Sequence, residues 1–105
     1  RLRDAGATVF IALLDDQSKR PVAIKGEAFP GTTPDELARM SRIVVRYNEA
    51  IVAKAAQYGA ITADFYNTTI FTDPATLYDD GNHPNPSGYD QIAQLWFASM
   101  EPLLK

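Results

Sequence analysis

Apolar runs and amphipathic stretches alternate along this chain, and their order predicts its architecture. Residues 7–14 form a continuously apolar run rich in β-forming residues, which is typical of a strand covered on both faces. A second such run covers residues 60–66, where Asp64 interrupts it, and an amphipathic stretch lies beyond each run. Alternating elements of these lengths imply βαβ units and a parallel sheet, so we predict the α/β fold class.

The first amphipathic stretch, residues 34–58, carries the clearest helix signals. Thr33 can cap the helix, Pro34 suits its first position, and Glu36 completes a capping box. Gly59 suits the position just past its end. Apolar residues recur at steps of three and four, which predicts one buried face. They are Leu37, Met40, Val44, Tyr47, Ile51, Ala55 and Tyr58.

A second helix is expected to begin at Ser87 and to stop at Pro102. Its broad apolar stripe, which includes Trp96 as a core residue, comprises Tyr89, Ile92, Ala93, Trp96, Phe97 and Met100. Residues 17–32 are polar and broken by prolines and glycines, which predicts a long loop with a short extended piece at residues 22–24.

The first seven residues resemble the last turn of a helix, with Gly6 just past its end. A helix end with no helix before it suggests that the chain is the C-terminal part of something longer. Such a chain would leave a sheet edge unpaired and apolar helix faces uncovered.

Composition narrows the classes of function. The 105 residues carry a net charge of −3 and no basic block, so the electrostatic footprint of a nucleic-acid binder is absent. No apolar run reaches the ~18 residues that a membrane span needs. The lack of cysteine excludes disulfides, a thiol nucleophile and thiolate metal sites. The compartment stays open, with a secreted or extracytoplasmic location slightly favoured.

The only histidine, His83, lies three residues after Asp80 in a run constrained by Pro84 and Pro86. Histidine can take a proton from a hydroxyl near neutral pH if an acceptor holds its other ring nitrogen. A carboxylate is such an acceptor, and it stabilises the imidazolium as it forms. We therefore predict that Asp80 and His83 form an acid–base pair. A metal site is disfavoured, because carboxylates do not cluster around this single histidine.

Other polar residues are candidates for the rim of the same site. Asp15 and Asp16 follow the first predicted strand, at the edge where parallel sheets bind ligands, although a solvated loop start explains them equally well. We name Asp15 and Asn82 as candidate substrate-binding residues. Asp64 is expected to make a structural hydrogen bond, and Ser87 to cap a helix rather than act as a nucleophile.

One block near the C-terminus carries a more specific signal. It combines, in order, Asp80, His83 and Pro84, then Gly88-Tyr89 and Ile92-Ala93 on the second predicted helix. This block resembles the C-terminal block of the SGNH (GDSL-type) serine hydrolases. The resemblance implies a three-layer α/β/α, flavodoxin-like fold with a parallel sheet. It also implies that residues 1–105 are the C-terminal portion of a single SGNH hydrolase domain.

The resemblance further implies a chemistry. A Ser-His-Asp triad would hydrolyse carboxylic esters without a cofactor, with Asp80 rather than Asp79 as the partner of His83. In that family the nucleophilic serine lies in a Gly-Asp-Ser motif, which this chain lacks. The N-terminal portion that carries the serine would then be missing or supplied by another chain.

The substrate class follows from a narrower similarity. The run DGNHPN at residues 80–85, together with Trp96, is similar to the carbohydrate acetylesterase branches of the family. It implies acetyl esters of carbohydrates as substrates. The alternative from another class is a non-catalytic module that keeps this fold and binds a glycan or a protein.

Overall fold

A computed structural model describes residues 1–27 and 30–104 of the chain. Its elements are β1 (Phe10–Leu13), the 3-10 helix η1 (Gln17–Lys19), α1 (Pro21–Ile24), α2 (Pro34–Tyr58), β2 (Ile61–Asp64), the 3-10 helix η2 (Pro74–Thr76), α3 (Pro86–Met100) and the 3-10 helix η3 (Glu101–Leu103). The two strands pair in parallel, with Phe10 opposite Ile61 and Leu13 opposite Asp64. The chain is therefore a mixed helix-and-strand, α/β structure with a parallel sheet, as predicted.

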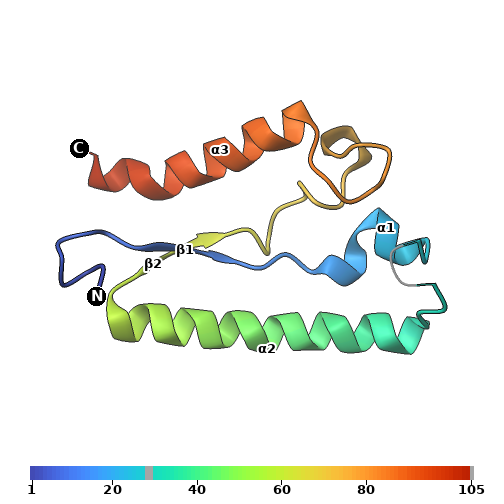
Figure 1. Cartoon of the computed structure of the whole chain (residues 1–105), viewed down its shortest axis with the longest axis horizontal. Helices are drawn as coiled ribbons and strands as arrows, with labels where there is room; N and C mark the ends of the chain where they lie inside the picture. The colour runs from blue at the N-terminus through green and yellow to red at the C-terminus, as the bar shows by residue number, and fades with distance from the viewer. Residues whose placement is uncertain (28–29, 105) are drawn as a thin grey trace.

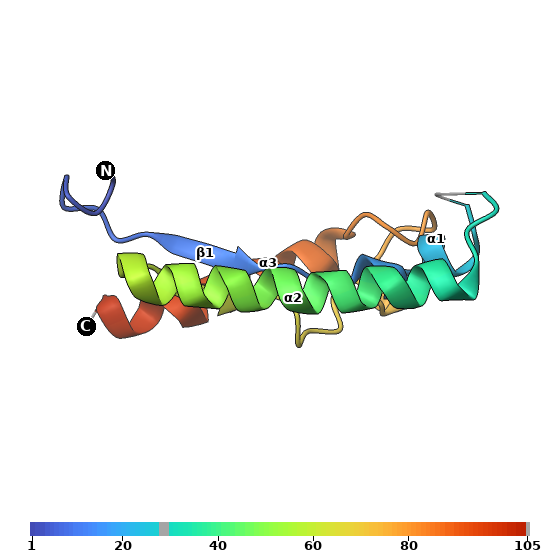
Figure 2. The same ribbon diagram turned by 90° about the horizontal axis from the view of Figure 1, so that it is seen from below.

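The sheet lies between the two long helices, with α2 on one side and α3 on the other (Figure 1). The molecule is elongated and thin, with extents of 47 × 29 × 19 Å. Figure 2 shows α2 running along most of its length. Within the described residues each strand has one neighbour, so each also has a free edge of unpaired backbone groups.

Helix α2 begins and ends as its sequence predicts. The Thr33 hydroxyl accepts a hydrogen bond from the Glu36 backbone N–H at 3.2 Å, and the Glu36 carboxylate accepts one from the Thr33 N–H at 2.8 Å. This reciprocal pair is the predicted capping box. Gly59 ends the helix with φ of 71°, a left-handed conformation that favours glycine.

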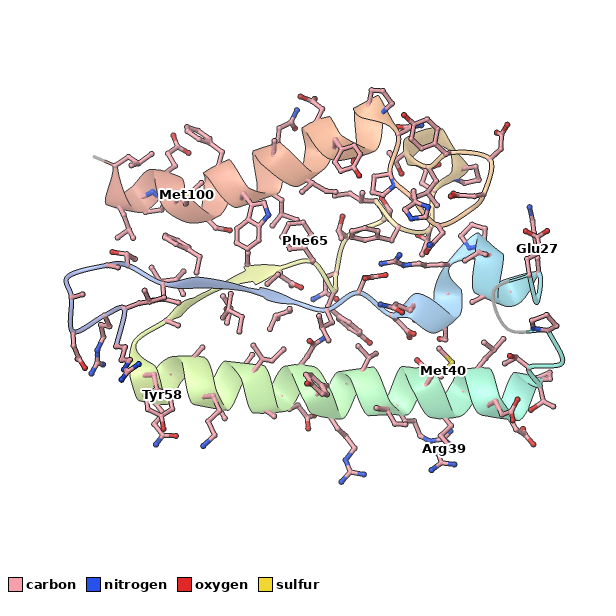
Figure 3. The ribbon with its side chains drawn as sticks, viewed as in Figure 1. Glu27, Arg39, Met40, Tyr58, Phe65 and Met100 are labelled. Atoms are coloured by element: carbon pink, nitrogen blue, oxygen red, sulfur yellow. The ribbon has the colours of Figure 1, made fainter. Side chains whose placement is uncertain are left out.

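The buried face of α2 follows the predicted stripe except at its two tyrosines. Tyr47 and Tyr58 were expected in the core, but they are 60% and 59% exposed. Ala55 is buried as predicted, and Asn48, which the stripe did not include, is buried as well. In Figure 3, Met40 faces the sheet side of α2, and Arg39 points away from it.

Asn48 ties α2 to the chain that leaves β1. Its side-chain oxygen accepts a hydrogen bond from the Leu14 N–H at 2.8 Å, and its side-chain N–H donates to the Leu14 carbonyl at 2.8 Å. One buried amide therefore satisfies both backbone groups of a residue just beyond the strand, where no further strand partner is available to it.

The small apolar core lies mainly under α3. Phe65, Ile70 and Leu77, from the segment after β2, are all buried. The ring of Phe65 lies 5.2 Å from that of Trp96 in a tilted arrangement, and Figure 3 shows Phe65 directed toward α3. Trp96, predicted as a core residue, is half-buried in this contact.

Three predictions about local structure are wrong. Residues 22–24 belong to α1 rather than to an extended piece, because Pro21 occupies the first position of a short helix. Residues 17–19 of the predicted loop are also helical, and its residues 28–29 lie outside the described part of the chain. Asn85, not Ser87, caps α3: its side-chain oxygen accepts from the Gly88 N–H at 2.9 Å.

The first residues form a hydrogen-bonded turn rather than a helix, although the turn closes as a helix end does. The Gly6 N–H donates to the Arg3 carbonyl at 2.9 Å, and the Ala7 N–H donates to the Leu2 carbonyl at 3.0 Å. With Gly6 at φ of 88°, these bonds make the Schellman pattern that closes helices. Strand β1 starts only at Phe10, so it is shorter than the apolar run suggested.

Replacing Asn48 should destabilise the fold. Asn48→Ala removes both hydrogen bonds to Leu14 and leaves two backbone groups without partners, at a cost of about 1–3 kcal/mol. Urea unfolding of the variant and of Glu49→Ala, an exposed neighbour on the same helix, measures the difference. Equal midpoints for the two variants would show that Asn48 is not a structural tie.

Candidate active site

The segment between η2 and α3 closes on itself as a short hydrogen-bonded loop. Leu77 and Pro84 form an antiparallel bridge at its base. The Tyr78 N–H donates to the His83 carbonyl at 2.9 Å, and the Gly81 N–H donates to the Tyr78 carbonyl at 3.0 Å. These bonds fix the backbone on both sides of Asp80, so the two predicted catalytic residues lie on one defined turn.

Gly81 lets this loop approach α1 closely. Its φ is 66°, and a Cβ there would lie 2.9 Å from the Pro21 side chain and 3.0 Å from the Val22 nitrogen. The Val22 N–H donates to the Gly81 carbonyl at 3.1 Å. Only glycine fits this contact without displacing α1. The loop therefore packs against the short helix that follows β1, and Figure 1 shows the two segments at the same end of the molecule.

Asn85 joins the loop to the start of α3. Its side-chain N–H groups donate to the carbonyls of Ala75 and Leu77 at 3.0 and 3.1 Å, and its backbone N–H donates to Thr76 at 3.0 Å. A Cβ on Gly88 would lie 2.2 Å from the Thr76 oxygen. The first turn of α3 is thus held tightly against η2, which anchors the loop from its C-terminal side.

The structure brings Asp80 and His83 together. One Asp80 oxygen accepts the backbone N–H groups of Asn82 and His83 at 2.9 and 3.0 Å. The other oxygen is hydrogen-bonded to His83 Nδ1. The Asp80 and His83 side chains remain 45% and 68% exposed, so the pair faces solvent at an open depression that Tyr78 and Asp79 also line.

The three hydrogen bonds stabilise the ionised form of Asp80. The His83 side chain, followed by the backbone N–H groups of His83 and Asn82, lowers the pKa of Asp80 from its ordinary 3.8 to about 2. Asp80 is therefore an ionised acceptor at neutral pH. In a neutral imidazole, a donating Nδ1–H leaves Nε2 unprotonated and able to accept a proton from a substrate or nucleophile.

Asp15 and Asn82 are brought together by a residue that sequence reasoning missed. Arg20 donates to both oxygens of Asp15, from Nε at 2.8 Å and from Nη2 at 2.7 Å, and its Nη1 donates to the Asn82 side-chain oxygen at 2.8 Å. The guanidinium lies over the ring of Phe71, 4.5 Å from its centroid. Nothing in the local spacing marks Arg20, because Asn82 is distant in the sequence.

Two further carboxylates, those of Asp16 and Asp64, make structural hydrogen bonds. Asp16 is buried and accepts the hydroxyl groups of Ser18 and Ser41, each at 2.5 Å, which fastens η1 to α2. Burial raises the pKa of Asp16, but these hydrogen bonds outweigh it, and the pKa is lower than usual. Asp64 accepts the backbone and side-chain N–H groups of Asn67 at 3.0 and 2.7 Å, which confirms its predicted structural role.

Among the described residues, three serine hydroxyl groups donate to partners other than His83. Ser18 and Ser41 donate to Asp16, and the Ser99 hydroxyl donates to the Leu95 carbonyl at 3.0 Å within α3. Ser87 lies in the first turn of α3. Across residues 1–27 and 30–104, no group of three or more metal-ligating side chains is placed to hold a metal ion.

Comparisons with known proteins found no relative of this chain. No protein-family model, curated protein or solved structure matches this chain. In the part of the chain that the structure describes, no helix is both long enough and apolar enough to cross a membrane. A functional conclusion therefore depends on the geometry of the Asp80–His83 loop.

The pKa of Asp80 gives a direct test of this geometry. The Asp80 carboxylate should titrate at about pH 2 in the unsubstituted chain. The NMR chemical shift of its side-chain carboxyl carbon, recorded as a function of pH, measures this titration. Because the folded pKa is lowered, the stabilisation is present above pH 3.8 and is lost as the pH falls through about 2. In His83→Ala the Asp80 pKa should rise, because the side chain that lowers it most is removed. A midpoint near 3.8 in the parent chain would contradict the arrangement.

Proposed function

We propose that this chain is the C-terminal portion of an SGNH-type serine ester hydrolase, in which Asp80 and His83 are two members of a Ser-His-Asp triad. The observation that carries the proposal is the hydrogen-bonded Asp80–His83 pair on a closed loop directly before α3. A parallel strand pair between two helices supports a place for this chain in a three-layer, flavodoxin-like α/β/α domain.

The proposed reaction uses His83 as a proton carrier. Nε2 takes the proton of the serine hydroxyl as its oxygen attacks the ester carbonyl, and returns that proton to the leaving alcohol. Water then attacks the acyl-enzyme by the same route, releasing the carboxylic acid and restoring the serine. Asp80 keeps Nδ1 protonated and stabilises the imidazolium while it carries the second proton. No metal or organic cofactor enters these steps.

The serine belongs to the N-terminal portion of the proposed domain, and the surface of this chain supports such a partner. The free edge of the sheet can accept a further strand. Large apolar side chains beside this sheet and along α2 are exposed, and they are Ile11, Leu14, Ile43, Val45, Tyr47, Val52 and Tyr58. A surface of this kind is suited to burial against another part of a hydrophobic core.

The proposed substrate is an ester that binds at an open site. The Asp80–His83 pair is solvent-exposed and lies in a depression rather than in an enclosed pocket. An open site leaves room for a bulky alcohol, and the similarity of residues 80–85 to the carbohydrate acetylesterase branches supports acetyl esters of carbohydrates as substrates. Trp96 packs on Phe65, so we assign it to the core rather than to sugar stacking.

The assay uses the assembled hydrolase, that is, this chain together with the N-terminal portion that carries the serine. His83→Ala should lower the turnover of an aryl acetate by about 10³–10⁶-fold, as in other triads. Asp80→Asn should cost a comparable or smaller factor, because the imidazole loses its orientation. Asp35→Asn, which changes an exposed carboxylate in the first turn of α2, is the matched control and should leave turnover unchanged. A serine-directed inhibitor should abolish the activity.

Full turnover in a folded His83→Ala protein would exclude the catalytic assignment. An assembled protein that neither turns over the acetate nor reacts with the inhibitor would instead favour the non-catalytic binding module. The two outcomes are distinct, since the first concerns one residue and the second concerns the class of protein.

A further inference from the structure

Arg20 occupies a position between the end of β1 and the Asp80–His83 loop. Its side chain and that of Asp15 are only 15% and 14% exposed. The guanidinium engages both Asp15 oxygens and still directs Nη1 to the Asn82 side-chain oxygen at 2.8 Å, with the Asn82 carbonyl at 3.4 Å. One planar cation thus spans two segments that are 62 residues apart in the sequence.

Asn82 is the point at which this contact reaches the catalytic pair. It lies between Asp80 and His83, and its backbone N–H donates to the same Asp80 oxygen that accepts the His83 N–H. Its side chain faces Arg20 while its backbone closes the turn. A displacement of Asn82 would therefore move one of the groups that hold the Asp80 carboxylate.

The surroundings favour arginine at this position. A guanidinium can bond a carboxylate with two parallel N–H groups while a third N–H serves another acceptor. It can also lie flat over an aromatic ring, as it does over Phe71. A lysine ammonium offers no such planar fork, so Arg20→Lys keeps the charge and loses the geometry. This difference allows the role of shape to be separated from that of charge.

We propose that Arg20 is the positioning residue of the site: held by Asp15 at the end of β1, it clamps the Asp80–His83 loop through Asn82. Asp15 and Asn82 then serve the site by holding and receiving Arg20, beside any contact with substrate. The Val22–Gly81 backbone hydrogen bond is a second attachment between the same two segments, so the clamp refines a loop that is already docked. The catalytic part of this inference rests on the proposed function.

The clamp itself is tested in this chain by hydrogen exchange. In Arg20→Gln the backbone N–H groups of Asn82 and His83 should exchange about tenfold faster or more, because the loop opens more often. Arg20→Lys should fail to restore their protection. Arg46→Gln, which changes an exposed arginine on α2, should leave both rates unchanged. Unchanged exchange in Arg20→Gln would overturn the clamp.

The positioning role is tested by turnover in the assembled hydrolase. Arg20→Gln should lower kcat for the aryl acetate by roughly 10–100-fold at a nearly unchanged KM, since misplacement of a catalytic group acts on the chemical step. Asn82→Ala keeps the Arg20–Asp15 pair and should have a similar effect. The double variant should be little worse than either single variant, because both remove one contact. Unchanged kcat, or additive losses, would overturn the positioning role.

The two arms separate this inference from the proposed function. If the parent assembly shows no esterase activity, the proposed function fails, and faster exchange in Arg20→Gln still supports the clamp. If the parent is active while Arg20→Gln keeps both its exchange rates and its kcat, the inference about Arg20 fails alone. Should Arg20→Gln not fold, Asn82→Ala provides both readouts.

Discussion

The Asp80 carboxylate is the group on which the proposed site depends. One of its oxygens accepts two successive backbone N–H groups and so shapes the turn, while the other holds the imidazole of His83. The same ionised group therefore determines where the histidine lies and which of its nitrogens carries the proton. Because both tasks fall to a single side chain, the geometry of the loop and the chemistry of the histidine cannot vary independently.

A series of polar contacts holds the segment after β1, against which this loop packs. Asn48 on α2 holds Leu14, Asp16 holds Ser41, and Arg20 connects the end of β1 to Asn82. Among the described residues no large side chain is completely buried, so the apolar core alone leaves much positional freedom. Directional hydrogen bonds from buried groups supply the precision that such a core lacks.

The sequence predicted best where the physics is local. The capping box of α2 and the Asp80–His83 pair each involve groups three residues apart, so spacing alone indicates the contact. The α/β class followed from element order. Pro21 was interpreted as a loop residue, although the same fixed φ also suits the first position of a helix. The finer SGNH fold remains a proposal.

The features that were missed depend on distant contacts or on polar residues inside apolar patterns. An apolar stripe identifies a helix face only to within about one position, and it gives no weight to a buried amide such as Asn48. The stripe therefore predicts Tyr47, rather than Asn48, as a core residue. The Arg20–Asn82 contact joins segments that meet only after the sheet has formed, so no local signal announces it.

The proposed site requires that Asp80 holds His83 with Nδ1 protonated and Nε2 free to accept a proton. Because the chain contains a single histidine, its two ring nitrogens can be assigned without ambiguity by ¹⁵N NMR at alkaline pH, where imidazole is neutral. We expect the Nδ1–H tautomer to dominate in the parent chain and to lose its dominance in Asp80→Asn. A parent chain in which the Nε2–H form dominates would contradict this expectation.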